Sequence, residues 1–220
     1  MESFLNMLGQ IGAGSLVTIK LFMVTLLFAL PLGLAMAFCR VSSYRVVNGI
    51  ANTYIWVLRG TPLMLQILFV YYGLPMIFPK LGEPGILPGF TAAALAFSLN
   101  YAAYFAEIFR GGIQSISKGQ YEGAKVLGLT YPQTMRRIIL PQVVKRVLPP
   151  LTNEVITLVK DTALVYVVAI NDLLRVATNI VSRDFIIVPF LVAAVFYLVM
   201  TSVLTFLLQR LEKRYAVYDD

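Results

Sequence analysis

The chain has 220 residues, of which 59% are hydrophobic and only 13% charged, and its mean hydropathy is +0.79. These values lie outside the range of ordinary soluble domains and indicate a membrane protein. A single cysteine, Cys39, excludes an internal disulfide, and the absence of histidine excludes His-ligated metals and His-based acid–base catalysis. We therefore expect no catalytic residues, no metal site and no cofactor.

Five stretches are long and apolar enough to cross roughly 30 Å of hydrocarbon. Only one of the five, residues 147–170, carries charged residues, which are Glu154, Lys160 and Asp161; the other four carry none. The first 20 residues lack the basic head and small-residue cleavage site of a signal peptide, and Gly12 to Ser15 is interpreted as the start of a helix. The sequence thus predicts one all-α membrane domain over residues 1–220, with spans at Leu21–Cys39, Gly60–Phe78, Ile86–Ala106, Val147–Ile170 and Phe185–Leu208.

The distribution of lysine and arginine predicts the orientation. The segments after spans one, three and five carry twelve: Arg40, Arg45, Arg110, Lys118, Lys125, Arg136, Arg137, Lys145, Arg146, Arg210, Lys213 and Arg214. The segments after spans two and four carry three: Lys80, Arg175 and Arg183. Because positive charge accumulates on the cytoplasmic side, we expect the amino terminus outside and the carboxyl terminus inside.

A polar segment, 118–141, lies in the predicted cytoplasmic loop between spans three and four. Residues 120–129 fit a short amphipathic helix, 130–132 break it, and 133–139 fit a second, basic helix that Pro141 should stop. The first helix is too short to be stable alone, so it needs either a lipid surface or a partner protein to lie on. The sequence has no GxxxxGK[ST] motif, so a partner would have to hydrolyse any ATP.

Sequence motifs favour the partner. The segment EGAKVLG at 122–128, followed by Ile138, Leu140 and Pro141, resembles the EAA loop of permease subunits in binding-protein-dependent ATP-binding-cassette importers. RGTPLMLQ at 59–66, FSLNYAAYFAEIFRGGI at 97–113 and NEVITLVKDTAL at 153–164 are similar to the polar amino acid uptake branch of that family. Gly123 stands where the family more often has alanine.

The resemblance implies a type I importer permease whose EAA loop is a coupling helix that docks on a cytoplasmic ATPase. The residues it assigns to that contact are Glu122, Gly123, Ala124, Lys125 and Gly128. It also implies two permease subunits, as a homodimer or with a similar chain, two ATPase subunits and an external solute-binding protein. The expected location is a prokaryotic cytoplasmic membrane.

Polar residues within the spans predict the transport site. Glu154, Thr157 and Asp161 share one helical face at i, i+3 and i+7, and Asn100, Tyr104 and Glu107 share one in span three at i, i+4 and i+7. Ionisable groups at this depth need a partner, water or a ligand. The alternative is that Lys160 pairs with Glu107 or Asp161 and that the stripe only joins helices.

In the functional interpretation a carboxylate meets the ammonium of an amino acid, while Asn100 and backbone near Gly60, Thr61 and Pro62 receive its carboxylate. Pro62 would free backbone carbonyls for a ligand or kink the span, and Gln66 would complete the site. The candidate substrate-binding residues are Thr61, Gln66, Asn100, Tyr104, Glu154, Thr157 and Asp161. Arg59 is interpreted as an interfacial anchor.

Two carboxylates on one face favour a basic amino acid such as arginine, lysine or histidine, with glutamine or another polar amino acid next. The function expected is an ATP-driven amino acid importer subunit, which is not itself an enzyme. Two alternatives stay open: a proton-coupled secondary transporter in which Glu154 and Asp161 titrate, and a membrane scaffold that recruits a cytoplasmic enzyme through residues 118–140.

Overall fold

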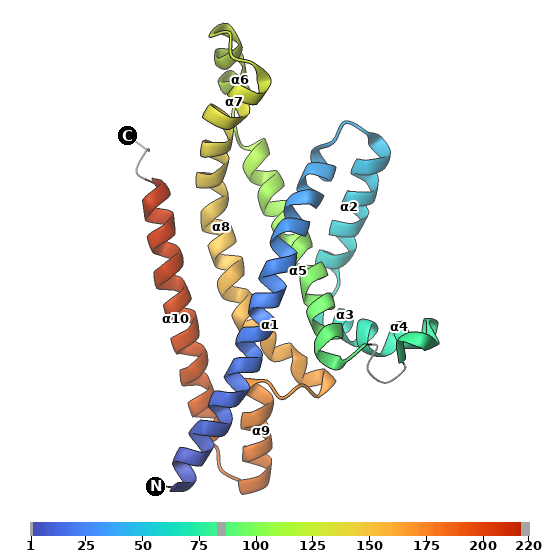
Figure 1. The fold of residues 1–220 in the computed structure, drawn as a ribbon, viewed down its shortest axis with the longest axis vertical. Coiled ribbons are helices and arrows are strands. Elements are labelled where there is room, and N and C mark those ends of the chain that lie inside the picture. The colour runs from blue at the N-terminus through green and yellow to red at the C-terminus, as the bar shows by residue number, and fades with distance from the viewer. Residues whose placement is uncertain (1, 83–86, 217–220) are drawn as a thin grey trace.

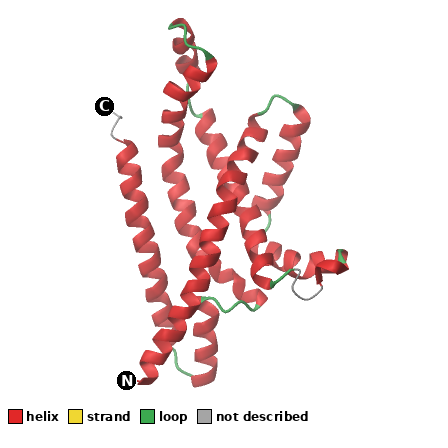
Figure 2. Ribbon diagram, viewed as in Figure 1, coloured by secondary structure: helices red, strands yellow, loops and turns green. Residues whose placement is uncertain are grey.

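The computed structural model describes residues 2–82 and 87–216, and within them the chain is helical with no strand (Figures 1 and 2). The α-helices are α1 (Glu2–Val41), α2 (Arg45–Gly60), α3 (Leu63–Leu68), α4 (Leu74–Ile77), α5 (Gly89–Gln114), α6 (Lys118–Val126), α7 (Tyr131–Thr134), α8 (Leu140–Asp161), α9 (Leu173–Asp184) and α10 (Val188–Ala216). Two π-helical turns, η1 (Phe69–Gly73) and η3 (Met135–Ile139), and two 3₁₀ segments, η2 (Pro79–Gly82) and η4 (Thr162–Val168), join some of them.

Three to five segments of the described chain are suited to cross a membrane. Phe4–Val41, Gly89–Gln114 and Val188–Tyr215 are single helices long and apolar enough to do so. Two further spans exist if each bent pair counts as one: Arg45–Gly60 with Leu63–Ile77, bent by 106°, and Tyr131–Val168 with Leu173–Asp184, bent by 54°. The predicted number of spans, five, equals the larger of these two counts.

The core lies where α1, α5 and α8 pack together, and α5 is the central helix (Figure 1). The buried face of α5 is built mainly from alanines, which let neighbouring helices approach closely. At the crossing of α1 and α5, a Cβ on Gly33 would lie 2.7 Å from the Cβ of Phe105 and 3.0 Å from the carbonyl oxygen of Ala102. Only glycine fits at this contact.

The ends of the bundle differ in character. The α6–α7 segment projects beyond the bundle at the end where α10 finishes, and the amino terminus lies at the other end (Figure 1). There the first turns of α1 pack against α9 and α10 through Met7, Ile11, Leu173 and Ala177. α10 itself is largely uncovered, with only 6% of its most apolar window buried, as a helix facing lipid would be.

Two predicted boundaries are wrong. Gly12 to Ser15 does not start a helix, because α1 begins at Glu2 and the Ser15 hydroxyl donates to the Gly12 carbonyl oxygen (2.6 Å) inside it. Pro141 does not stop a helix, because the chain remains helical from Tyr131 to Val168. In η3 the Leu140 N–H donates to the Met135 carbonyl, and this wide turn accommodates a proline that has no N–H of its own.

Span two differs most from its prediction. The residues expected to form a cytoplasmic loop, 45–59, belong to α2, which packs against α1 and α5. The helix then breaks at Thr61 and Pro62, in the middle of the span and not near its start, and α3 and α4 leave at a sharp angle (Figure 1). A straight helix over Gly60–Phe78 is therefore wrong, and the break places residues 59–63 at the edge of a cavity.

Candidate binding site

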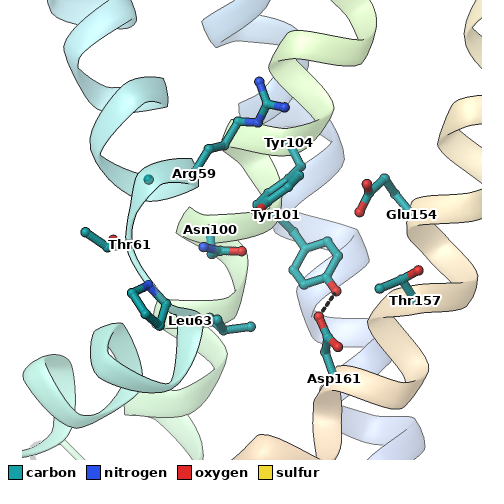
Figure 3. Close-up of a pocket in the computed structure, with 11 residues that line it drawn as sticks. Arg59, Thr61, Leu63, Asn100, Tyr101, Tyr104, Glu154, Thr157 and Asp161 are labelled. Atoms are coloured by element: carbon teal, nitrogen blue, oxygen red, sulfur yellow. Dashed lines mark hydrogen bonds between the residues drawn. The ribbon is translucent and has the colours of Figure 1, made fainter.

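A cavity of about 430 Å³ opens between the break after α2, the middle of α5 and the lower half of α8 (Figure 3). Six of the seven predicted substrate-binding residues line it, namely Thr61, Asn100, Tyr104, Glu154, Thr157 and Asp161. The others that line it are Arg59, Gly60, Pro62, Leu63 and Tyr101. The antiparallel course of α5 and α8 brings Asn100 and Asp161 to one cavity.

The α8 wall carries the acidic groups. Glu154, Thr157 and Asp161 all face the cavity, which confirms the shared helical face (Figure 3). The Tyr101 hydroxyl donates to Asp161 Oδ2 at 2.6 Å. Among the described residues, no hydrogen bond or ion pair is formed by the half-buried Glu154 carboxylate. One carboxylate is thus held by tyrosine, and the other remains available to a ligand.

The opposite wall is the break itself, and its geometry follows from Pro62. Proline has no N–H, so the Leu58 carbonyl, four residues earlier, lacks its helical donor. Gln66 Nε2 donates to this oxygen at 2.8 Å and Asn100 Nδ2 at 3.0 Å. Two side-chain amides therefore replace the missing backbone donor, and they tie α3 and α5 to the end of α2.

These bonds change the roles expected of three predicted residues. Asn100 Nδ2 also donates to Gln66 Oε1 (3.0 Å), so both of its hydrogens are used, and its oxygen points toward the cavity (Figure 3). Gln66 Nε2 further contacts the Thr61 carbonyl oxygen at 3.1 Å and the Thr61 hydroxyl at 2.8 Å. The Leu58 carbonyl is occupied, not free for a ligand. Asn100 has an acceptor to offer, not the carboxylate donor expected from the sequence.

Arg59, interpreted from the sequence as an interfacial anchor, lines the cavity. Its guanidinium carbon is 5.2 Å from the ring centroid of Tyr104, and Arg59 lines the cavity on the side opposite Glu154 (Figure 3). A cation this close to an aromatic face is attracted by the ring. The signal available in the sequence was the position of Arg59 three residues before a proline within a span.

Tyr101 was also missed, although it follows Asn100 directly and lies three residues before Tyr104. The helical periodicity that selected Asn100 and Tyr104 places position 101 on the edge of the same face. The proposed pairing of Lys160 does not occur in the described chain: Glu107 pairs with Arg110, and Asp161 with Tyr101. Lys160 is exposed.

The predicted coupling residues lie on and just after α6, at the projecting end of the bundle (Figure 1). Ala124 is buried against the chain, whereas Glu122, Gly123, Lys125 and Gly128 are exposed. Gly128 has a φ of +71° and ends α6, with Gly128 N donating to the Lys125 carbonyl and Leu129 N to the Ala124 carbonyl. Val126 and Leu127 are 87% and 76% exposed, which leaves an uncovered apolar surface beside these polar residues.

Comparison with known proteins identifies the family to which most of the chain matches. Residues 29–217 match the family described as binding-protein-dependent transport system inner membrane component. The arginine transport system permease protein ArtQ of Bacillus subtilis is 39% identical over 202 residues, which cover 91% of this chain and 90% of that protein. The glutamine transport system permease protein GlnP of Escherichia coli is 40% identical over the same shares of each.

Solved structures show the same architecture. A crystal structure of an amino acid ABC transporter with histidines superposes with a TM-score of 0.86 at 37% identity, over 96% of this chain and 97% of that one. An inward-facing structure of the MetNI methionine ABC transporter gives a TM-score of 0.72 at 17% identity, which shows the fold alone. The chain therefore belongs to the family of binding-protein-dependent transport system inner membrane components.

Proposed function

We propose that the chain is the membrane-spanning subunit of an ATP-driven importer, and that the cavity between α2, α5 and α8 binds an amino acid in transit. The observation that carries the proposal is the arrangement of charge. Arg59 stands on one side of the cavity and the carboxylates of Glu154 and Asp161 on the other (Figure 3). This arrangement complements a zwitterion, with the guanidinium receiving the α-carboxylate and a carboxylate receiving the α-ammonium.

The substrate class follows from the charge that remains. Arg59 and one carboxylate match the two charged groups of the amino acid backbone, and a second carboxylate is left over. A buried charge without a partner is unfavourable, so the site favours a substrate with a cationic side chain. A relative named for arginine and one named for glutamine have nearly the same sequence identity to this chain, 39% and 40%, so identity does not choose between the two substrates. The surplus carboxylate favours the basic amino acids.

The assembly we propose has two permease chains, either identical or similar, since one short bundle gives an incomplete pathway. Each would dock one ATPase subunit on α6 at the cytoplasmic end, with the amino terminus and α9 at the external end. A solute-binding protein would deliver the amino acid to the segments 80–88 and 171–184, of which 83–86 lie outside the described residues. ATP binding would then move α6 and open the cavity to the other side.

Binding of radiolabelled L-arginine and L-glutamine to the assembled complex tests the site. Glu154→Gln should weaken arginine binding about 10-fold or more, since a desolvated charge pair is worth about 1.4 kcal/mol at least, and should change glutamine binding far less. Lys160→Gln, on the exposed face of the same helix, is the matched control. Equal arginine affinity in the two variants would refute the site.

The energy source needs a separate measurement in liposomes. Uptake should require ATP on the ATPase side and should persist when the proton gradient is collapsed. Uptake driven by a proton gradient without any ATPase would instead establish the secondary transporter, and binding of partners without any uptake would establish the scaffold.

A further inference from the structure

A second cavity, of about 370 Å³, adjoins the first at Arg59, Gly60 and Tyr104. Its remaining polar lining comes from Arg40 in the last turn of α1, Asn52 in α2 and Glu107 near the end of α5. These helix ends lie toward the end of the bundle that carries α6 (Figure 1). The second cavity therefore continues the first one in the direction of α6.

The face of α2 toward this cavity carries the polar side chains of Asn52 and Arg59 beside the apolar Ile55 and Trp56. Asn48, Asn52 and Arg59 recur at i, i+4 and i+11, so they lie on one side of the helix. Asn52 and Arg59 are exposed in the single chain. Polar side chains at this depth are costly against hydrocarbon, so this face needs water or another protein next to it.

The sign of the charge reverses between the two cavities. The first contains two carboxylates and, in Arg59, one cation. The second contains Arg40 and Arg59, while its single carboxylate, Glu107, is bound by Arg110, with Arg110 Nε 2.9 Å from Glu107 Oε2. Arg40 donates to Asn48 Oδ1 at 3.0 Å, which is a neutral partner. Positive charge is thus in surplus in the second cavity.

We infer that the second cavity is a water-filled, electropositive vestibule through which the amino acid leaves, and that Arg59 stacked on Tyr104 is the wall between it and the binding cavity. The identity of the passenger rests on the proposed function, whereas the water and the charge do not. A cationic amino acid that reaches the vestibule finds no free carboxylate there. The vestibule therefore offers the amino acid no binding site of its own and does not retain it on its way out.

Cysteine labelling of the assembled complex tests this directly. Cys39 is the one cysteine of the sequence, so in a Cys39→Ser background Asn52→Cys is the single cysteine of this chain, and labelling is read on the isolated band of this chain. Small methanethiosulfonate reagents would be used in two forms, the anionic sulfonatoethyl and the cationic trimethylammonioethyl. Ser43→Cys, in the exposed turn between α1 and α2, reports that reagent reaches this end of the protein.

Asn52→Cys should react with both reagents. The measured quantity is the reaction rate with the anionic reagent divided by the rate with the cationic reagent. This ratio should be at least 3-fold higher for Asn52→Cys than for free 2-mercaptoethanol, because a positive potential attracts the anionic reagent. Arg40→Gln should lower that preference, and Arg45→Gln, which removes a nearby cation outside the cavity lining, should lower it less.

Two results would overturn the inference. Failure of Asn52→Cys to react while Ser43→Cys reacts would mean that lipid or a second copy of the chain covers the cavity. Reaction without any anionic preference would mean that the vestibule is wet but not electropositive. Neither result depends on arginine binding, so a failure here is distinct from a failure of the proposed substrate site.

Discussion

Asn100→Leu tests whether side-chain amides hold the break in span two. Asn100 is only 3% exposed, and its two donated bonds are both 3.0 Å long. Hydrogen bonds between helices in membranes average about 0.6 kcal/mol and reach about 1.7 kcal/mol, so losing two should cost about 1–3 kcal/mol. Leucine has a similar volume, which keeps the loss of packing small.

The measurement is unfolding in mixed micelles with increasing SDS, followed by circular dichroism. The single tryptophan, Trp56, lies on α2 six residues before Pro62, so its fluorescence reports the break locally. The control is Ser98→Ala on the same helix, since Ser98 is 6% exposed and its buried hydroxyl has no hydrogen-bond partner among the described residues. It should change stability by less than about 0.5 kcal/mol.

A third variant separates hydrogen bonding from shape. Asn100→Asp keeps the shape of the side chain, but even its protonated form supplies only one hydrogen to two acceptors. It should therefore destabilise the protein about as much as leucine does. If aspartate is tolerated, or if Asn100→Leu costs no more than Ser98→Ala, the amide bonds do not hold the break and our reasoning fails.

Three further variants test other contacts. Gly33→Ala should lower the free energy of unfolding by about 1–3 kcal/mol more than Gly12→Ala in the same assay. The reason is that a Cβ at Gly33 meets the backbone of α5, whereas one at Gly12 has nothing within 4 Å. Equal losses would contradict the close crossing of α1 and α5. Leu127→Asp should leave unfolding unchanged and weaken ATPase binding in a pull-down at least 10-fold, and undiminished binding would rule out this docking surface. Tyr101→Phe should destabilise the protein by about 1 kcal/mol, and by less when Asp161→Ala has already removed its acceptor; additive losses would show that the two side chains are not coupled.

The sequence by itself determined the membrane class, the helical architecture and the polar face of α8. Apolar length decides whether a segment can cross hydrocarbon, and helical periodicity decides which residues share a side. Both properties are local, so Glu154, Thr157 and Asp161 could be placed on one face without knowing what they face. The motif around residues 122–128 is equally local, and the family match agrees with it.

Only the tertiary structure decided what the polar groups contact. The low hydropathy of α2, to which Arg45, Asn52 and Arg59 contribute, made it resemble a loop, and only the structure shows that Asn52 and Arg59 line a cavity. The replacement of the Pro62 amide by Gln66 and Asn100 joins residues up to 42 positions apart. The identity of a hydrogen-bond partner depends on which segments meet in space, and helical periodicity carries no information about that.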